Sequence, residues 1–208
     1  HYGEKVENNH LFMIYEQLMD SSGYRQRRDA VDEYNRSNEF LKKGLAITPV
    51  KFGISFTTSF LNQSGALILI YTDGTILVNH GGTEMGQGLH TKMQQIAAAE
   101  FGVSPARVKV NATNTSKVPN TSATAASAGA DLNGMAVKNA ADILKTRIAE
   151  AVAAIFTEKH PEDPSRADAI VFENDRIADS RHRDRSILFA EAMPQMQLRQ
   201  VSLSASGF

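Results

Sequence analysis

The sequence contains no cysteine among its 208 residues. A chain without cysteine cannot form disulfides, hold an iron–sulfur cluster by itself, build a thiolate zinc site or use a cysteine nucleophile. The absence fits a reducing compartment, and we therefore expect a cytoplasmic protein.

The sequence also lacks an excess of charge of one sign and a long apolar run. Lys and Arg together number 22, and Asp and Glu number 23, which gives a net charge of -1. This balance provides no electrostatic reason to expect nucleic acid or an anionic membrane as a partner. The longest strongly apolar run, Gly65 to Tyr71, is far shorter than the roughly 20 residues that cross a bilayer.

The two ends of the sequence have the pattern of the interior of a longer chain. The first residue is His1, no signal-peptide pattern follows it, and Val201 to Phe208 reads as a strand that runs into a turn. We therefore expect a piece of a larger protein. With 42% hydrophobic and 22% charged residues, this piece has the composition of an ordinary globular protein.

The first 42 residues have a helical pattern. Leu11 to Asp20 favours a helix with Asn9 as its N-cap, and Ser21 to Gly23 interrupts that helix. Tyr24 to Ser37 favours a second, highly charged helix. We expect residues 1–42 to be an N-terminal helical segment, either a surface helical hairpin or a solvated layer over the core.

A β-rich region follows, in which Lys51 to Leu61 is rich in Phe, Ile and Thr. Ala66 to Tyr71 and Thr75 to His80 flank Asp73-Gly74, which is a strong hairpin signal because both turn residues tolerate positive φ. The first arm of this hairpin is apolar without alternation, so we expect it to be buried on both faces.

Helices, a strand and a loop follow the hairpin. The apolar spacing predicts one helix from Leu89 to Phe101, which Gly102 ends, and another from Asp131 to Ile155. Val108 to Val110 favours a short strand, and Asn111 to Ser127 is a loop rich in Ser, Thr and Asn.

The last part of the sequence begins with a charged stretch from His160 to Arg185 that carries two prolines. We expect a surface excursion there, in which Ile170 to Phe172 forms a small strand. Leu188 to Met193 favours a short helix, and Arg199 to Ala205 alternates like a strand. Interspersed helices and strands, with an antiparallel pair as the clearest strands, predict an α+β domain over residues 43–208.

The strongest local motif is the strand, glycine loop and helix from His80 to Thr91. Glycines let backbone N–H groups approach a ligand, and the helix points its free N–H groups and positive end at the loop, which suits a phosphate. The motif is neither a P-loop nor a dinucleotide fingerprint, because it lacks Gly-Lys-Ser/Thr and has Thr91 in place of the third glycine. The alternative is that the loop is only a tight connection.

A second loop–helix junction, Pro119 to Gly129, is rich in hydroxyls and small side chains. Small residues leave room for a bulky ligand on the backbone, whereas the alternative is a polar surface loop with Ser and Thr caps. Two such junctions favour an anionic, ring-bearing cofactor. His80, Glu84 and His90 are candidate metal ligands, but their spacing matches no common site and we do not expect direct ligation.

Long segments of the sequence match one family almost without gaps. These segments are Gly44 to Thr57, Leu61 to Leu67, Tyr71 to Gly74, Gly81 to Lys92, Val118 to Ser127 and Val201 to Phe208. With them the chain resembles the xanthine dehydrogenase/oxidase family of molybdenum hydroxylases. The resemblance covers most of Lys43 to Met135 and the C-terminal end, and His160 to Arg185 carries no motif of the family.

The resemblance implies part of a molybdenum-cofactor-binding domain with a mixed or antiparallel sheet and packed helices. It implies a parent protein that hydroxylates purines, from hypoxanthine and xanthine to urate, at a molybdenum–molybdopterin centre. Iron–sulfur clusters and FAD on other parts of the complex would then carry the electrons away. The parent is expected to be a heterotetramer with an FAD/iron–sulfur subunit, and this chain alone is expected to hold no cofactor.

The resemblance also assigns residues to the site. By this resemblance Met85 and Gln87 contact the pterin, Phe56 packs on the purine ring and Thr57 hydrogen-bonds the purine. The segment that grips the dithiolene and phosphate region consists of Ala125, Ala126, Ser127 and Ala128, with the backbone of Ala126 beside the molybdenum. The family's catalytic glutamate and arginine have no counterpart in the sequence, so we expect no catalytic residue here. From the sequence pattern alone, Phe56 is a core strand residue.

Two other functions stay open. The chain is a subunit-assembly or binding module if the helical segment and the charged excursion contact partner subunits. Alternatively, the parent is a related hydroxylase that acts on aldehydes or on another N-heterocycle.

Overall fold

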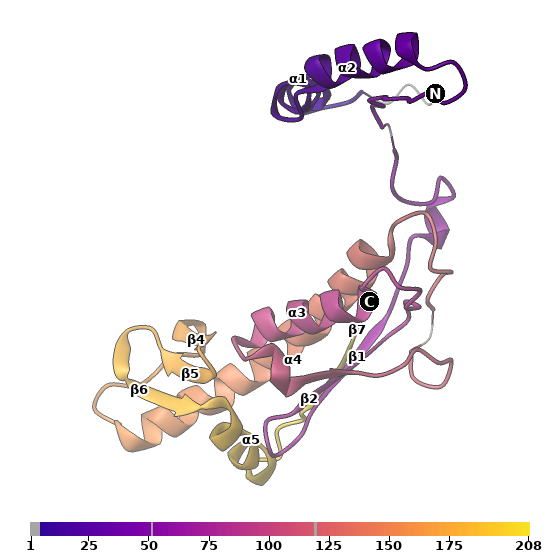
Figure 1. Cartoon of the computed structure of the whole chain (residues 1–208). Coiled ribbons are helices and arrows are strands. Elements are labelled where there is room, and N and C mark those ends of the chain that lie inside the picture. The colour runs from indigo at the N-terminus through magenta and orange to yellow at the C-terminus, as the bar shows by residue number, and fades with distance from the viewer. Residues whose placement is uncertain (1–4, 51, 119) are drawn as a thin grey trace. The chain divides into compact units, whose positions relative to one another are not determined.

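The computed structural model describes residues 5–50, 52–118 and 120–208. Lys51, Pro119 and the first four residues, which belong to segments discussed above, lie outside the described residues. Contacts divide the chain into two units, residues 1–53 and residues 54–208 (Figure 1). Among the described residues, none of the helices has the length and apolar character needed to cross a membrane.

The first unit contains the two predicted helices. Helix α1 spans Leu11–Ser21 and helix α2 spans Tyr24–Ser37, and Gly23 between them has a φ of 59°. The predicted N-cap is shifted by one residue, because His10 holds the cap position while the Asn9 side chain accepts the Leu11 N–H at 3.0 Å. The chain after α2 returns along this helix, where Asn35 exchanges two hydrogen bonds with the backbone of Lys43.

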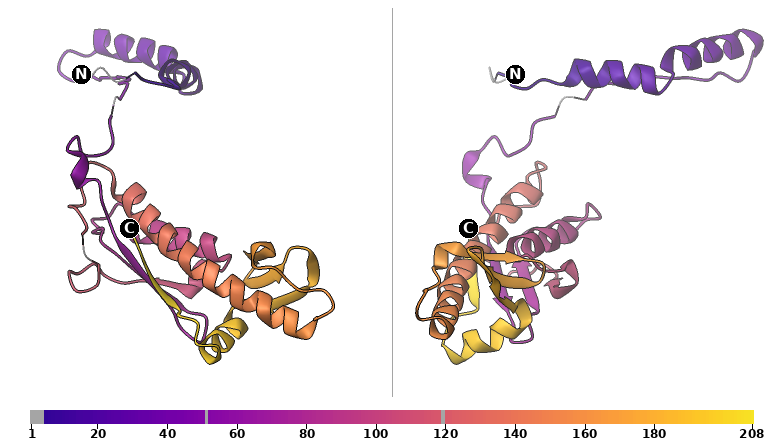
Figure 2. Two further views of the ribbon diagram at one scale, coloured as in Figure 1. Left: turned by 180° about the vertical axis from the view of Figure 1, so that it is seen from behind. Right: turned by 90° about the vertical axis from the view of Figure 1, so that its left-hand side faces the viewer.

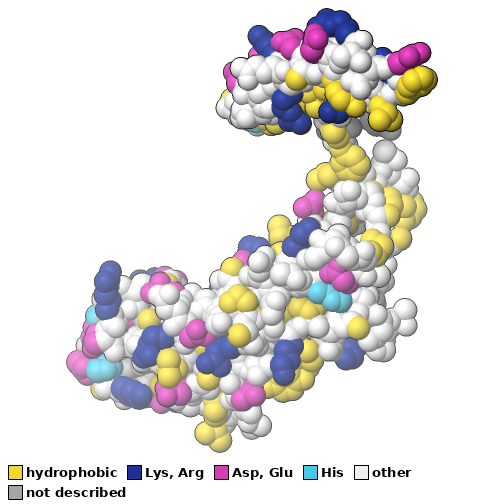
Figure 3. Space-filling view, in the orientation of Figure 1, with side chains coloured by type: hydrophobic (Ala, Val, Ile, Leu, Met, Phe, Trp, Pro, Cys, Tyr) yellow, Lys and Arg dark blue, Asp and Glu magenta, His cyan; other side chains and the backbone are white. Residues whose placement is uncertain are grey.

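Apolar side chains of the first unit are left exposed. No residue of α1 or α2 is buried. Figure 3 shows apolar side chains gathered on this unit, and Phe12 and Phe40 are 77% and 89% exposed. The two helices therefore have no apolar core of their own in the part of the chain that the structure describes.

The second unit is built on a four-stranded mixed sheet with the strand order β3-β2-β1-β7. The strands are β1 (Ala66–Ile70), β2 (Ile76–His80), β3 (Val108–Val110) and β7 (Ser204–Gly207). Strand β1 pairs antiparallel with β2 and β7, whereas β2 pairs parallel with β3. Helices α3 (Leu89–Phe101) and α4 (Gly129–Lys159) pack side by side on one face of this sheet (Figures 1 and 2). The predicted α+β fold is confirmed.

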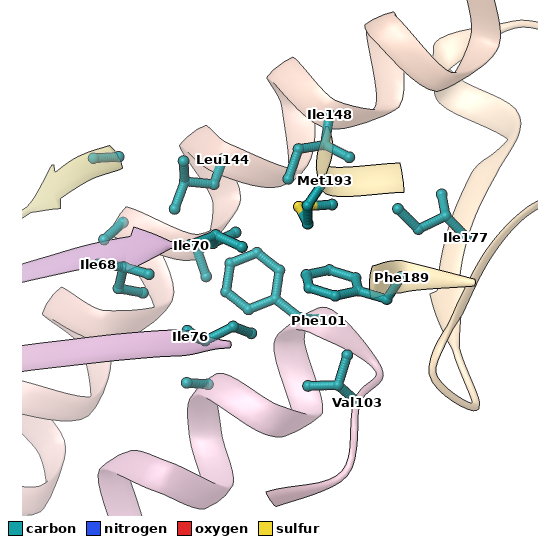
Figure 4. Packing of buried hydrophobic residues seen from close by; sticks show 14 of the residues in the cluster. Ile68, Ile70, Ile76, Phe101, Val103, Leu144, Ile148, Ile177, Phe189 and Met193 are labelled. Atoms are coloured by element: carbon teal, nitrogen blue, oxygen red, sulfur yellow. The ribbon is translucent and has the colours of Figure 1, made fainter. Parts of the chain in front are cut away.

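The core lies between that sheet face and the helices. The fully buried side chains include Ile68 and Ile76 from the sheet, Phe101 from α3 and Leu144 from α4. Figure 4 shows Phe101 beside Phe189, whose ring centroids are 6.0 Å apart. Burying such side chains contributes roughly 1.5–3 kcal/mol each, which makes this layer the main stabilising element of the unit.

The predicted hairpin of β1 and β2 is confirmed, with two corrections. Of the two turn residues, only Gly74 has a positive φ, of 80°, while Asp73 instead accepts the Thr75 N–H at 2.8 Å. Strand β1 is fully buried on one face only, because Leu67 and Leu69 are half-buried on the other face.

The β-rich pattern from Lys51 to Leu61 does not form a strand among the described residues. Residues 52–58 are irregular, and Ser59–Leu61 forms a short 3-10 turn. The Asn62 side chain accepts the Phe56 N–H and donates to the Phe56 carbonyl, each at 2.9 Å. These two bonds satisfy the backbone groups that a strand would have paired, so Phe56 is not a core strand residue.

The charged C-terminal region is more ordered than the sequence predicted. It forms a three-stranded antiparallel sheet of β4 (Ile170–Glu173), β5 (Arg176–Asp179) and β6 (His182–Leu188). The small strand expected at Ile170 to Phe172 is confirmed, and most of residues 170–185 of the expected surface excursion also lie in strands. A fully buried Ile177 anchors this sheet, and a buried Arg185 donates to the Asp163 carbonyl at 2.7 Å.

Three elements differ in their bounds from the sequence prediction. Helix α4 is longer than predicted at both ends, and helix α5 spans Phe189–Leu198 with Pro194 inside it. Strand β7 begins only at Ser204, because residues 199–200 form a turn and residues 201–203 have no regular structure. The alternation from Arg199 onward therefore predicted a strand that is too long.

Candidate functional site

The two loop–helix junctions lie against each other at the N-terminal ends of α3 and α4. The Thr83 N–H donates to Thr124 Oγ1 at 2.8 Å. A methyl group added at Gly81 would overlap the Thr121 side chain, so this approach requires glycine. Residues distant in sequence are thus brought into contact at these two helix ends.

A third segment joins the same surface. The Ser55 N–H donates to the Ala126 carbonyl at 3.0 Å, and Ser55 has a left-handed backbone with a φ of 79°. The next two residues are the predicted substrate residues, of which Phe56 is half-buried and Thr57 is exposed. The structure therefore ties the segment of Phe56 and Thr57 to the second loop through Ser55, although the roles of these residues stay predictions.

The glycine loop is braced by two of its own side chains. The Gln87 amide donates to the Thr83 carbonyl at 2.9 Å and accepts the Met85 N–H at 2.6 Å. The Glu84 carboxylate accepts the N–H groups of residues 86, 88 and 90. Met85, in contrast, is 66% exposed and makes the loop's main apolar surface. In this conformation the polar atoms of Gln87 bond to the loop itself.

The expectation that α3 offers its N-terminus to a phosphate is wrong for this conformation. The carboxylate of Glu84 already accepts the His90 N–H at 2.9 Å and the Gly88 N–H at 3.0 Å. The pKa of Glu84 lies below its ordinary value, chiefly because of the bond from His90, so the side chain is an anion at neutral pH. This internal anion occupies the positive end of α3.

The second junction is open. Its helix α4 begins after Ala128, whose methyl side chain cannot accept a hydrogen bond, and no described side chain caps this end. Ala126 and Ser127 both have a left-handed backbone with a φ of 54°, and Ala128 is buried. Of the four predicted residues, Ala125 and Ser127 are exposed and Ala126 is half-buried. Together they present backbone rather than side chains at the start of the helix.

A buried polar cluster supports both junctions. Ser64 donates to Asn133 Oδ1, and Asn133 Nδ2 donates to the Gly129 carbonyl at 2.8 Å. The same Nδ2 lies 2.7 Å from the place that a side chain at Gly82 would occupy. Asn133 on α4 therefore contacts both loops and the segment before β1. The sequence reasoning missed this residue, whose only signal is a polar side chain on the apolar face of a helix.

His80 and His90 belong to the same region. Their rings pack edge to face with centroids 5.1 Å apart, and His80 Nδ1 accepts the Gly82 N–H at 3.1 Å. Burial, with a further contribution from His90, lowers the pKa of His80 from 6.5 to about 4, so the ring is neutral at pH 7. Among the described residues, no cluster of three histidines or acidic side chains could hold a metal ion.

Solved structures share this fold. The Cu,Mo-CO dehydrogenase superposes with a TM-score of 0.66 at 19% identity, over 92% of this chain and 25% of that one. Quinoline 2-oxidoreductase from Pseudomonas putida 86 gives a TM-score of 0.61 at 24% identity, over 69% of this chain and 18% of that one. The chain therefore shares its fold with parts of these two enzymes.

The family follows from the sequence. Residues 17–208 match the molybdopterin cofactor-binding domain family, and the chain belongs to that family. It is 49% identical over 148 residues to xanthine dehydrogenase/oxidase of Gallus gallus, which covers 71% of this chain. It is 53% identical to xanthine dehydrogenase of Emericella nidulans over the same share, and 50% identical to that of Dictyostelium discoideum over 78% of the chain. The chain spans only 11–12% of the length of these relatives.

The residues of the site fit a molybdopterin group. The uncapped start of α4 and the exposed backbone before it suit an anion, because free N–H groups and the positive helix end meet there. Gly86 and Gly88 have no described atom within 4 Å of the position of an added side chain, which leaves open space beside Met85. A ligand group beside Gly86 and Gly88 would therefore meet no neighbouring side chain at these two positions.

Proposed function

We propose that the chain is the part of a xanthine dehydrogenase that receives the molybdopterin cofactor and forms one wall of the purine site. The single observation that carries the proposal is the convergence of residues 55–57, 83–87 and 124–128 on one surface. About half of the aligned residues, which make up 71–78% of the chain, are identical to those of proteins named as xanthine dehydrogenases, and this supports a purine as the substrate.

The proposed roles follow the places of the side chains. Met85 and Gln87 contact the pterin, the first through its exposed side chain and the second after its amide turns outward from the loop. Ala125 to Ala128 hold the anionic part of the cofactor through backbone groups, and the backbone of Ala126 lies beside the metal. Small side chains are required there because a larger one would fill the space of the ligand.

The substrate side of the site is carried by the segment that Asn62 and Ala126 hold in place. Phe56 offers a half-buried ring on which a purine stacks, and Thr57 offers an exposed hydroxyl that hydrogen-bonds the purine edge. When bound, the molybdenum cofactor supplies the oxidation of the purine carbon. The chain itself orients the ring, while the base and the charge-stabilising arginine are proposed to lie in other parts of the parent protein.

The parent is proposed to be a heterotetramer in which an FAD/iron–sulfur subunit receives the electrons. Residues 1–42 are proposed to be an N-terminal helical segment, and residues 43–208 are proposed to be the cofactor-binding domain. The predicted cytoplasmic location stays a prediction, which cell fractionation would test.

The test uses the full-length parent protein. We expect molybdenum and pterin to copurify with it and xanthine to be oxidised to urate. Phe56→Ala should raise the KM for xanthine more than it lowers kcat, because stacking binds the ground state and the transition state alike. A parent free of molybdenum would contradict the proposal. A preference for aldehydes or another N-heterocycle in a substrate panel would contradict the purine assignment and keep the cofactor assignment.

A further inference from the structure

Glu84 lies in the middle of the glycine loop, and its carboxylate faces the start of α3. One oxygen accepts the Gly86 N–H at 2.9 Å and the Gly88 N–H at 3.0 Å, while the other accepts the His90 N–H at 2.9 Å. Bonds from N–H groups to a carboxylate are stronger than those between neutral groups. A single side chain thus fixes the backbone of most of the loop.

The loop needs such a device because Gln87, its other brace, bonds only to the backbone of Thr83 and Met85 and does not hold the two glycines. Gly86 and Gly88 have φ values of 97° and 74°, and no described atom lies near either position to hold it by packing. Glycine loses more conformational freedom on ordering than any other residue. An unbraced loop would therefore have to be ordered by the ligand, at a cost in affinity.

From these contacts we infer that Glu84 is a positioning residue for the cofactor, a role that rests on the proposed function. It holds residues 83–90 in the binding shape before the cofactor arrives. It also fills the N-terminus of α3 with the chain's own anion, so that the anionic part of the cofactor is directed to the uncapped start of α4.

The experiment compares Glu84→Ala, Glu84→Gln and a matched control, Glu150→Ala, in the full-length protein. Glu150 is an exposed glutamate on α4. Molybdenum and pterin content are measured on protein from cofactor-sufficient cells. Amide hydrogen exchange of residues 83–90 is measured on protein from molybdate-starved cells, which reports the loop without the cofactor.

Glu84→Ala should lower the molybdenum content about tenfold, as is typical when a group that orients a metal site is lost. Exchange of the amides of residues 86, 88 and 90 should accelerate roughly tenfold, because the carboxylate cap that protects them is gone. The molybdenum content and the exchange rates of Glu84→Gln should lie between those of the wild type and of Glu84→Ala, since its amide oxygen can accept two of the three bonds. Glu150→Ala should match the wild type in both measurements.

Inorganic phosphate tests the second half of the inference. In cofactor-free Glu84→Ala protein, phosphate should slow the exchange of the same amides, because the empty helix end can then bind an anion. The wild type should show no such protection. Phosphate protection of equal size in the wild type would overturn the view that Glu84 occupies this end.

Wild-type molybdenum content together with wild-type exchange in Glu84→Ala would overturn the positioning role. If that variant fails to fold, a wild-type exchange rate at the His90 amide in Glu84→Gln would overturn it instead. A wild-type protein free of molybdenum and pterin would overturn the proposed function, and the exchange measurement would still decide whether Glu84 orders the loop.

Discussion

The two loop–helix junctions of the site look alike along the sequence but differ at their helix N-termini. At α3 a carboxylate of the chain accepts three backbone N–H groups. At α4 the cap position belongs to Ala128, which has no acceptor to offer. A helix N-terminus is open to a ligand only where the protein's own side chains leave its N–H groups free. The number of glycines in the preceding loop does not predict whether these groups are free.

The junctions also differ in how they are built. The first uses Gly86 and Gly88 for backbone conformations that other residues adopt at a cost. The second places Ala126 and Ser127 in left-handed conformations without glycine, where the contact with Ser55 helps to hold the backbone. Strain of this kind persists only where neighbouring contacts fix the chain.

A substitution that pushes the two loops of the junctions apart should have the largest effect on stability. Gly81→Ala places a methyl group on the Thr121 side chain and should lower the free energy of unfolding by about 3 kcal/mol. Urea unfolding of the chain measures the change. Thr121→Gly added to Gly81→Ala should restore part of the loss, whereas Gly44→Ala, with no described atom within 4 Å, should be nearly neutral. A Gly81→Ala chain as stable as the wild type would show that the loops do not touch.

Removing the shared support should cost somewhat less. Asn133→Ala leaves the Ser64 hydroxyl and the Gly129 carbonyl without their partner, at a cost of about 2 kcal/mol. Hydrogen exchange should accelerate at both junctions together, because the residue contacts both. Met135→Ala, an exposed position on the same helix, is the matched control. Acceleration at only one junction would contradict the idea of a common support.

His80 should make the first junction sensitive to acid. Its pKa is about 4 in the folded protein, against an ordinary value of 6.5, so the unfolded chain binds the proton first as the pH falls. Stability should therefore decrease between about pH 6.5 and pH 4, by about 1.5 kcal/mol after allowance for solvent screening. His80→Asn keeps an acceptor for the Gly82 N–H and should lose this dependence. An unchanged pH profile in His80→Asn would rule out this residue as the cause.

The smallest predicted effect is a difference in stability between two glycine variants, one from each junction. Gly86→Ala must adopt a φ of 97° and should lose about 1 kcal/mol. Gly129→Ala has an ordinary helical φ and contacts no closer than 3.5 Å, so it should be neutral or slightly stabilising. Thermal unfolding of both variants measures the difference. Equal losses in the two variants would mean that backbone conformation is not what distinguishes the junctions.

Regular elements with a strong apolar period were predicted well. Helix α3 ends at Gly102 as its pattern indicated, because the residues that face the core recur at helical spacing. Strands in the charged C-terminal region were mostly missed, since alternate residues there are paired charges rather than apolar side chains. Arg185 is buried but is held by Asp163, and a sequence pattern does not show which charges find partners.

For the site, the sequence located the segments but not their chemistry. The loops that carry Met85, Gln87 and Ala125 to Ala128 are joined by the bond from the Thr83 N–H to Thr124 Oγ1, while the roles that the resemblance implies for these residues stay predictions. The part played by Glu84 was not foreseen, although an acidic residue just before a helix is a known capping signal. The irregular segment around Phe56 was read as a strand because β propensity ignores the Asn62 side chain that binds its backbone.

The sequence by itself determined the family, the α+β class and the residues that make up the two loops. Motifs and apolar periods depend only on residues that are close together in the sequence. Only the tertiary structure decided which of the two similar loop–helix junctions is closed and which is open. That difference depends on where one carboxylate points and on which backbone groups lie within its reach. Which N–H groups lie within hydrogen-bond distance of the carboxylate depends on the folded backbone and not on the spacing of residues in the sequence.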